Sequence, residues 1–316
     1  MAAPMDGHPP GTSCMQTRSS AAEPSLSAAG APRRPARSTG VARTGRGATG
    51  VPAFAGEPAS APPWVTRGEL GRALRENAFG LYLQPIADPG RGHVAGYEML
   101  LRWRHAGRGL LLPEDFIPFA EATGFIVDID RWVVEHAADY LWSWRRRGYD
   151  GWLAVNVSAR SLEDAGFVAD VTRIVEASPE LPGHFLMELT ETAQARNAEA
   201  VGAALASLRR AGVRIAIDDF GSGYTSLASL SDLGFDAIKI DRTLLTQLGR
   251  DRRVDAIVRS VIFLARELDV TVVAEGVECD AQRAWLAEYR NVLAQGYLLG
   301  RPAPAGAVAL HLGELR

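Results

Sequence analysis

From Trp64 onward, short runs of apolar and β-branched residues alternate with longer segments in which apolar residues recur at helical spacing. This alternation is typical of repeated strand–helix units. The short runs predict strands at 81–85, 95–101, 152–157, 185–190, 214–217, 237–240, 271–274 and 292–294. The longer segments predict helices at 114–121, 129–147, 168–177, 198–211, 251–268 and 281–288. The pattern therefore indicates an α/β fold.

Eight strands with intervening helices in about 250 residues match a (β/α)8 barrel, although the periodicity fits a doubly wound open sheet nearly as well. Polar residues favour the barrel, because its strands end on one face, where such enzymes place their chemistry. A strand end often meets solvent, so one or two polar residues there would be ordinary. Here Glu98 lies inside the second strand, and six more lie at or just past strand ends: Asn156, Glu188, Asp218, Lys239, Glu275 and Gln295.

The acidic and amide residues of this set offer oxygen ligands. Oxygen donors without Cys or His suit Mg²⁺ or Mn²⁺ rather than zinc. The adjacent pair Asp218 and Asp219 fits a two-metal centre, in which one carboxylate bridges and the next binds the second ion. Adjacent acids are common in solvated loops, but this pair follows a strand and precedes the glycine-rich segment 220–223. The set predicts hydrolysis of a phosphate ester.

Lys239 is the only lysine among the 34 lysine and arginine residues of the chain. A lysine carries a compact, mobile ammonium that the planar guanidinium of arginine does not imitate. The survival of one lysine by chance is the alternative. Its position at the end of a buried strand, two residues before Asp241, favours a catalytic role.

Composition limits the other possibilities. Residues 1–63 hold ten of the 18 prolines and almost no large aliphatic side chains, so we expect a disordered Ala/Pro/Gly/Arg-rich tail before a domain at 64–316. No apolar run is long enough for a membrane span. Two cysteines cannot form a disulfide framework or a zinc site, which favours the cytoplasm. A net charge of -3 argues against a nucleic-acid binder.

Taken in order, the motifs resemble those of one known family. Residues 97–102 (YEMLLR) resemble the signature for which EAL domains are named, with Met99 in place of its alanine. Strand alternation points Met99 away from the direction of Glu98, towards packing. The resemblance covers residues 78–302 and continues through 113–124 (PEDFIPFAEATG), 156–158 (NVS), 188–191 (ELTE), 218–221 (DDFG), 239–241 (KID), 275–278 (EGVE) and 295–297 (QGY).

The resemblance implies a modified TIM (β/α)8 barrel with an antiparallel first strand, which opens cyclic di-GMP to linear pGpG with two Mg²⁺ or Mn²⁺ ions. The matching positions imply that the first ion is held by Glu98, Asn156, Glu188 and Asp218, and that Asp219 helps to hold the second. They imply that Lys239 and Glu275 are catalytic, with Glu275 as the base for the attacking water. Water and metal ligands would be oriented by Asp241 and Gln295.

The resemblance also implies contacts to the substrate and to a second copy of the chain. Gln84 and Arg102 would contact cyclic di-GMP, Arg102 through a phosphate. Glu191 resembles the residue that steadies the loop 220–226, which links a homodimer contact to the metal site. Phe220, Gly221 and Glu278 belong to the same coupling set.

Two other functions compete with an active phosphodiesterase. A catalytically silent EAL domain would bind cyclic di-GMP or a protein partner, but such members typically lose a metal ligand, the lysine, the base or the loop glutamate, and this chain keeps all of them. An HD-type phosphodiesterase needs a His-Asp pair, and none of the six histidines is followed by Asp. No GGDEF-like cyclase motif is present.

Overall fold

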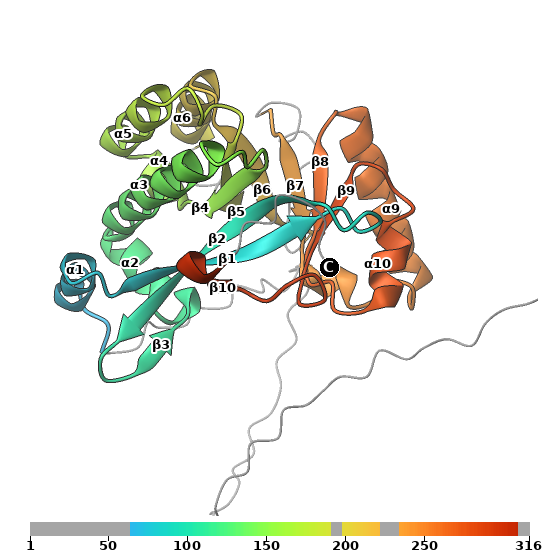
Figure 1. Ribbon diagram of the computed structural model, residues 1–316, viewed down its shortest axis with the longest axis horizontal. Helices are drawn as coiled ribbons and strands as arrows, with labels where there is room; N and C mark the ends of the chain where they lie inside the picture. The colour runs from blue at the N-terminus through green and yellow to red at the C-terminus, as the bar shows by residue number, and fades with distance from the viewer. Residues whose placement is uncertain (1–63, 191–197, 222–233, 309–316) are drawn as a thin grey trace, which may run out of the picture. The chain divides into compact units, whose positions relative to one another are not determined.

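The computed structural model describes residues 64–190, 198–221 and 234–308. The chain divides into two units, Met1–Pro58 and Ala59–Arg316, and the described residues all belong to the second unit (Figure 1). The predicted tail 1–63, Glu191 and most of the loop 220–226 lie outside the described residues.

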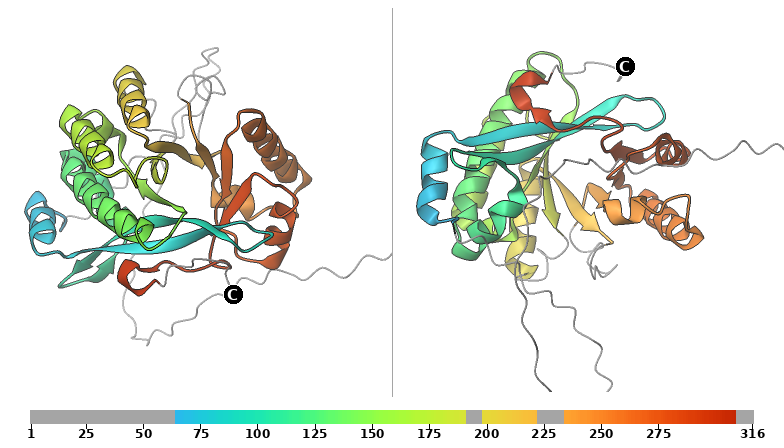
Figure 2. Two further views of the ribbon diagram at one scale, coloured as in Figure 1. Left: turned by 45° about the horizontal axis from the view of Figure 1, so that its top comes forward. Right: turned by 90° about the horizontal axis from the view of Figure 1, so that it is seen from below.

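Within the described residues, eight strands close into a barrel (Figure 2). Neighbours around the ring follow the order β1, β9, β8, β7, β6, β5, β4 and β2, and pairing between β1 and β2 closes it. The predicted barrel is therefore confirmed over the open sheet. The ring consists of β1 (Phe79–Ala87), β2 (Val94–His105), β4 (Trp152–Asn156), β5 (Phe185–Thr190), β6 (Arg214–Phe220), β7 (Ala237–Ile240), β8 (Thr271–Ala274) and β9 (Val292–Gln295).

Strand β1 is the exception to the parallel arrangement. It pairs antiparallel with β2 on one side and with β9 on the other, whereas the other ring pairs are parallel. The predicted antiparallel first strand is thus confirmed. Two short strands, β3 (Gly109–Leu111) and β10 (Ala303–Pro304), pair with β2 and β1 outside the ring.

Helices pack against the outer surface of the barrel, with α3, α5 and α6 along one side and α9 and α10 along the other (Figures 1 and 2). The apolar side chains between helices and strands form the main core. No helix in the described part of the chain has the length and apolar character needed to cross a membrane. The helices are α1 (Arg67–Arg75), α2 (Ile117–Thr123), α3 (Ile126–Arg145), α4 (Ala159–Leu162), α5 (Ala165–Glu176), α6 (Ala198–Arg210), α8 (Arg242–Leu245), α9 (Arg252–Glu267) and α10 (Asp280–Leu286), with 3₁₀ turns η1 (Pro113–Asp115) and η3 (Ala305–Ala307).

A second, smaller core fills the barrel interior towards the N-terminal ends of the parallel strands. It consists of Ala154, Leu186, Ala216 and Ala237, with Trp152 packed against them. Gly96 of β2 completes this layer, because a Cβ atom there would lie 2.5 Å from the Trp152 ring. Small residues, Leu186 and the Trp152 ring therefore close this end of the barrel.

Several predicted boundaries shift by a few residues, and two of the differences change the description of an element. The single helix expected at 114–121 is split into η1 and α2, since Phe116 has φ -141° and ψ -24° and interrupts the helical backbone. Strand β6 extends to Phe220, so Asp218 and Asp219 lie within the strand rather than beyond it.

Candidate metal centre

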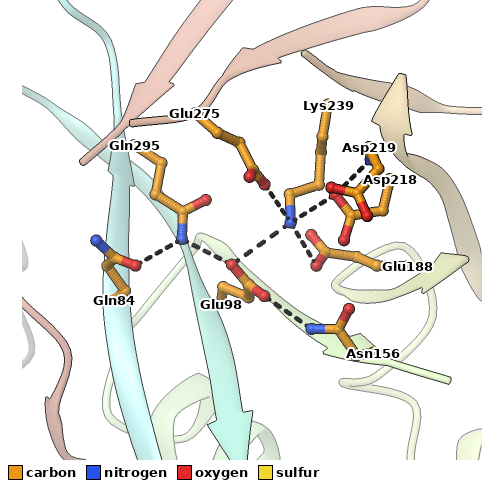
Figure 3. Close-up of polar contacts among 9 residues, drawn as sticks. All are labelled: Gln84, Glu98, Asn156, Glu188, Asp218, Asp219, Lys239, Glu275 and Gln295. Atoms are coloured by element: carbon orange, nitrogen blue, oxygen red, sulfur yellow. Dashed lines mark hydrogen bonds and ion pairs between the residues drawn. The ribbon is translucent and has the colours of Figure 1, made fainter. Parts of the chain in front are cut away.

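The side chains at the C-terminal ends of the strands converge on Lys239, whose side chain is 1% exposed (Figure 3). Its Nζ lies 2.6 Å from Glu275 Oε1 and 2.8 Å from Glu188 Oε2. Asp218 Oδ1 and Glu98 Oε2 lie 3.3 and 3.4 Å from the same nitrogen. One buried ammonium therefore contacts four carboxylates from four different strands or strand ends.

Strand alternation explains why these side chains meet. Side chains at i and i+2 share one face of a strand, so a residue two positions beyond the small interior layer also points into the barrel. Ala154 precedes Asn156, Leu186 precedes Glu188, and Ala237 precedes Lys239 in this way. The register pairs Asn156 with Glu188, which places their side chains at a similar height. The interior is thus apolar at one end and charged at the other.

Asp218 and Asp219 depart from this alternation. Consecutive residues of a regular strand point to opposite faces, yet both carboxylates turn towards the cluster in Figure 3. The register of β6 against β7 shifts between Ile217 and Phe220, and Asp219 adopts φ 56°, a left-handed conformation that is uncommon for a residue other than glycine. The irregularity lets two adjacent acids serve one site. Such local strain is often found at functional positions.

Glu98 is held by three donors from three other strands. Asn156 Nδ2 donates to Oε1 at 2.7 Å, Gln295 Nε2 donates to Oε2 at 2.7 Å, and Lys239 lies beside Oε2. Burial alone would raise the pKa of Glu98, but Lys239 and the two amide donors outweigh it and leave the pKa below its ordinary value. Glu98 is therefore held as a carboxylate in a fixed orientation.

The other charged groups are shifted in different directions. Burial, together with the nearby charges of Glu98 and Asp218, raises the pKa of Glu188 well above its ordinary value. Burial also raises the pKa of Glu275, to about 7, although the adjacent Lys239 opposes the shift. Burial alone would lower the pKa of Lys239, but the surrounding carboxylates raise it well above its ordinary value. The lysine is thus a cation at neutral pH.

The chemistry of this donor set fits divalent cations. Four carboxylates face one ammonium, and such an excess of buried negative charge is unfavourable without further cations. Glu188 Oε1 is buried without a hydrogen-bond partner among the described residues, so it is available as a ligand atom. Oxygen atoms of Asp218, Asp219 and Glu275 lie within 4.8 Å of one another, close enough to share an ion. Oxygen-only ligands of this kind suit Mg²⁺ or Mn²⁺.

The remaining predicted site residues lie around this cluster. Gln295 Nε2 also donates to Gln84 Oε1 at 3.1 Å, which joins β9 to β1. Arg102 on β2 is half-buried, donates to the Leu101 carbonyl oxygen at 2.7 Å and lies over the ring of Tyr82. Asp241 caps α8 by accepting from the Thr243 N–H at 2.8 Å, and its charge helps to raise the pKa of Asp219 after burial and Asp218.

The predicted coupling residues are only partly described. Phe220 is buried at the end of β6, and Gly221 follows with φ 98°. A Cβ atom at Gly221 would lie 2.8 Å from Leu244 Cδ1, so this turn packs closely on α8. Glu278 is exposed, and its backbone N–H donates to Gln282 Oε1 at 2.8 Å. Among the described residues, the ion-pair partners of Lys239 are other residues than these.

A cavity of about 710 Å³ opens beside the cluster and was not expected from the sequence. Asp130 of α3 lines it together with Asn156 and Glu188, and burial raises the pKa of Asp130 to about 7. Its Oδ2 accepts from the Ser158 N–H at 2.9 Å and from Ser161 Oγ at 2.6 Å. The signal in the sequence was an acid on the apolar face of a helix, where a charge is normally avoided.

Comparisons with known proteins agree with this geometry. The chain is 40% identical over 238 residues to the bifunctional diguanylate cyclase/cyclic di-GMP phosphodiesterase MucR of Pseudomonas aeruginosa, which covers 75% of this chain and 35% of MucR. It is 40% identical over 249 residues to the cyclic di-GMP phosphodiesterase NbdA of the same organism, covering 78% of this chain and 32% of NbdA. The chain thus spans about a third of the length of these curated relatives.

A solved structure and the family model also match this chain. A structure described as the PaMucR phosphodiesterase in complex with c-di-GMP superimposes with a TM-score of 0.71 at 40% identity, covering 76% of this chain and 97% of that one. The sequence model of the EAL domain matches residues 67–302, which include the barrel and the whole described cluster. The chain therefore belongs to the EAL domain family.

Proposed function

We propose that this chain hydrolyses cyclic di-GMP to linear pGpG, using two divalent cations, Mg²⁺ or Mn²⁺. The observation that carries the proposal is the cluster of four carboxylates around the single buried lysine, beside a cavity that Glu188 and Asn156 line. Its relatives named as cyclic di-GMP phosphodiesterases support the choice of substrate.

The ligands of the first cation would be Glu98, Asn156, Glu188 and Asp218, and Asp219 would help to hold the second. The fixed orientation of Glu98 and the unpartnered Glu188 Oε1 support this division. Bound cations supply positive charge at the phosphoryl oxygens and acidify a nearby water. The irregular backbone at Asp219 serves this arrangement, because a regular strand would point that carboxylate away.

Glu275 would accept the proton of the attacking water. A general base works best when its pKa lies near the working pH, and the pKa of Glu275 is raised to about 7. In the reaction, the water oxygen forms a bond to phosphorus, its proton passes to Glu275, and the bond from phosphorus to the 3′ oxygen breaks. That oxygen then takes up a proton and becomes the 3′ hydroxyl of pGpG.

Lys239 would act as a fixed positive charge rather than as a base. Its raised pKa keeps the ammonium protonated at neutral pH, so it cannot accept the proton of the water. Its contacts with Glu188 and Glu275 hold both carboxylates in place. A preorganised cation at the site of developing negative charge stabilises the transition state without reorganisation.

The substrate would lie across the mouth of the barrel, with one part in the cavity of about 710 Å³. A pocket of this size accommodates a nucleotide-sized ligand. Arg102 would contact a phosphate, since a guanidinium matches phosphate oxygens in geometry and charge. Its position on β2, four residues beyond Glu98, supports that role.

The experiment is an incubation of the purified chain with cyclic di-GMP and Mn²⁺ or Mg²⁺, followed by chromatography of the nucleotides. We expect pGpG to appear, to stop appearing in excess EDTA, and to be suppressed by Ca²⁺, whose longer bonds suit the site poorly. Turnover that continues in excess EDTA would contradict the metal mechanism. Binding of cyclic di-GMP without any turnover would instead identify a silent receptor.

We also propose that the chain acts in the cytoplasm as a homodimer, with its interface near the loop 220–226 and with Glu191 coupling that interface to the metal site. The support is the resemblance of these positions to the family, since most of them lie outside the described residues. Sedimentation velocity should show a dimer, and Glu191→Ala should lower turnover. Equal turnover of that variant at all Mg²⁺ concentrations would contradict the coupling.

A further inference from the structure

The side chain of Gln84 on β1 links the backbone at Gly300 to Gln295 and, through Gln295, to Glu98, a proposed ligand of the metal centre. Its side chain is 9% exposed, and both atoms of its amide contact other parts of the protein. Gln84 Oε1 accepts from Gln295 Nε2 at 3.1 Å, and Gln84 Nε2 donates to the Gly300 carbonyl oxygen at 3.1 Å. The same Gln295 Nε2 donates to Glu98 Oε2 at 2.7 Å. Figure 3 shows the inner part of this chain, from Gln84 through Gln295 to Glu98.

The two end groups of this series of hydrogen bonds, Glu98 and the Gly300 carbonyl, fix the orientation of the amides of Gln84 and Gln295. Glu98 is a carboxylate and Gly300 offers a carbonyl, so both ends can only accept hydrogen bonds. Gln295 must therefore turn its NH₂ group towards Glu98, and the same group reaches Gln84. If the amide of Gln84 were flipped, its NH₂ would face the NH₂ of Gln295 and its oxygen would face the Gly300 carbonyl. A single arrangement of donors and acceptors thus satisfies the three hydrogen bonds that link Gly300, Gln84, Gln295 and Glu98, while Gln295 Oε1 stays buried without a hydrogen-bond partner among the described residues.

The backbone around these hydrogen bonds restricts the movement of the residues that make them. Gln84 and Glu98 are directly opposite each other in the β1–β2 pair, and the neighbouring Ile86 is opposite Gln295 in the β1–β9 pair. A Cβ atom at Gly300 would lie 2.5 Å from Pro85 Cγ, so the segment after Gln295 packs directly on β1. The N–H of Val277, two residues beyond Glu275, donates to the Gln295 carbonyl oxygen at 3.0 Å.

We infer that Gln84 is a positioning residue of the metal centre, which acts on Glu98 through Gln295, rather than a residue whose main role is to contact the substrate. The inference rests on the proposed function, because it assigns Gln84 to the metal centre of that reaction. Gln84 orients the amide of Gln295, and that amide in turn fixes the oxygen of Glu98 that faces Lys239. Residues that orient a metal ligand typically change metal affinity by 10- to 100-fold when they are replaced.

The test is the affinity of the purified full chain for Mn²⁺, measured by isothermal titration calorimetry without nucleotide. Gln84→Met keeps the length of the side chain and removes both hydrogen bonds, so we expect Mn²⁺ affinity to fall about tenfold. Raising the Mn²⁺ concentration should then restore most of kcat, with little change in KM for cyclic di-GMP. An unchanged Mn²⁺ affinity with a raised KM would overturn the inference and make Gln84 a substrate contact.

A second variant separates the two hydrogen bonds of Gln84. An ionised Gln84→Glu side chain can still accept from Gln295 but cannot donate to Gly300. We expect its Mn²⁺ affinity to stay within about threefold of the wild type, since the partner that orients Gln295 is retained. A Gln84→Glu variant as weak in Mn²⁺ binding as Gln84→Met would overturn the route through Gln295.

Gln282 provides a matched control. It is also a buried glutamine, which accepts from the Glu278 N–H and donates to the Leu245 carbonyl oxygen at 2.8 Å each, but it contacts none of the proposed metal ligands. Gln282→Met should lower the melting temperature while Mn²⁺ affinity stays within about twofold of the wild type. A loss of Mn²⁺ affinity equal to that of Gln84→Met would show a general loss of stability and overturn the inference.

The calorimetry also separates this inference from the proposed function. A wild-type chain that binds Mn²⁺ but leaves cyclic di-GMP intact would contradict the proposed activity. The Mn²⁺ affinities of the Gln84 variants would still test the positioning role of Gln84. A wild-type chain that binds no Mn²⁺ would overturn the metal centre and the role of Gln84 together.

Discussion

The two ends of the barrel interior differ in chemistry although the same strands build both. Towards the N-terminal ends of the parallel strands, Ala154, Leu186, Ala216 and Ala237 pack with Trp152. One interior position further along, the layer is charged, and Lys239 contacts four carboxylates. The distance between the two layers is two residues along each strand.

The apolar layer contributes to the stability of the fold, whereas the charged layer carries the groups proposed for the reaction. The apolar layer removes surface from water and stabilises the barrel. The charged layer places like charges in a buried position, which is unfavourable for folding unless cations balance them. The apolar layer thus supplies the support on which the charged layer depends. A replacement in the apolar layer should therefore lower stability and leave turnover nearly unchanged. A replacement in the charged layer should lower turnover without lowering stability.

The largest effect on chemistry should come from Lys239→Arg. An arginine keeps the charge, but its longer planar group does not fit a site in which Nζ lies within 2.8 Å of both Glu188 and Glu275. We expect kcat to fall at least about a hundredfold while cyclic di-GMP still binds. Steady-state kinetics together with equilibrium binding would measure both quantities. Turnover within threefold of the wild type would show that a precisely placed ammonium is not needed.

The pH dependence of turnover should be the next largest effect. Glu275 must be a carboxylate to accept a proton, and its pKa is raised to about 7, so the active form is lost as the pH falls below that value. We expect kcat/KM to decrease about tenfold per pH unit below this pKa. The rate at fixed Mn²⁺ between pH 5 and 9 gives the profile. A rate that stays constant down to pH 5 would rule out Glu275 as the base.

Asp130 differs from the acids of the charged layer, because it is a buried acid held by Ser158 and Ser161 rather than by a cation. Its folded-state pKa is raised from 3.8 to about 7, so the stability it contributes is present below about pH 4 and is lost as the pH rises towards 7. Asp130→Asn removes this loss. We expect the free energy of unfolding of the variant, relative to that of the wild type, to rise by about 3 kcal/mol from pH 5 to pH 8.

Urea unfolding of both proteins at the two pH values measures this gain. An amide oxygen in the place of Oδ2 keeps both accepted hydrogen bonds, so the fold should be preserved. A difference between variant and wild type that is the same at pH 5 and pH 8 would show that Asp130 does not titrate in this range.

The sequence was sufficient to predict most of the barrel. Strands at 185–190, 237–240 and 271–274 have the predicted bounds, because buried parallel strands are short apolar runs with clear ends. The short helices α4 and α8 were not predicted. Each has only four residues and depends on a side-chain cap, Ser158 for α4 and Asp241 for α8, rather than on helical periodicity.

The cluster itself was predicted from its polar residues, but its internal contacts were not. The backbone irregularity at Asp219 depends on the register between β6 and β7, which a pattern of residue types does not contain. The hydrogen bond from Gln84 to Gly300 joins positions 216 residues apart in the sequence. The cavity at Asp130 depends on how α3 packs over β4. These features arise from the closed barrel and not from any local segment.

The most direct test of the division between the two layers uses one strand. Leu186 and Glu188 lie two residues apart on the inward face of β5, the first in the apolar layer and the second beside Lys239. Turnover and melting temperature would be measured for Leu186→Ala and Glu188→Gln. Leu186→Ala should lose about 3 kcal/mol of stability and keep kcat within about twofold in its folded form.

Glu188→Gln should show the reverse. We expect kcat to fall at least about a hundredfold with no decrease in melting temperature, because a crowded buried charge is replaced by a neutral group of the same shape. We expect this crossed pattern of effects on kcat and melting temperature. Loss of turnover and stability together in both variants, or an active Glu188→Gln enzyme, would contradict it.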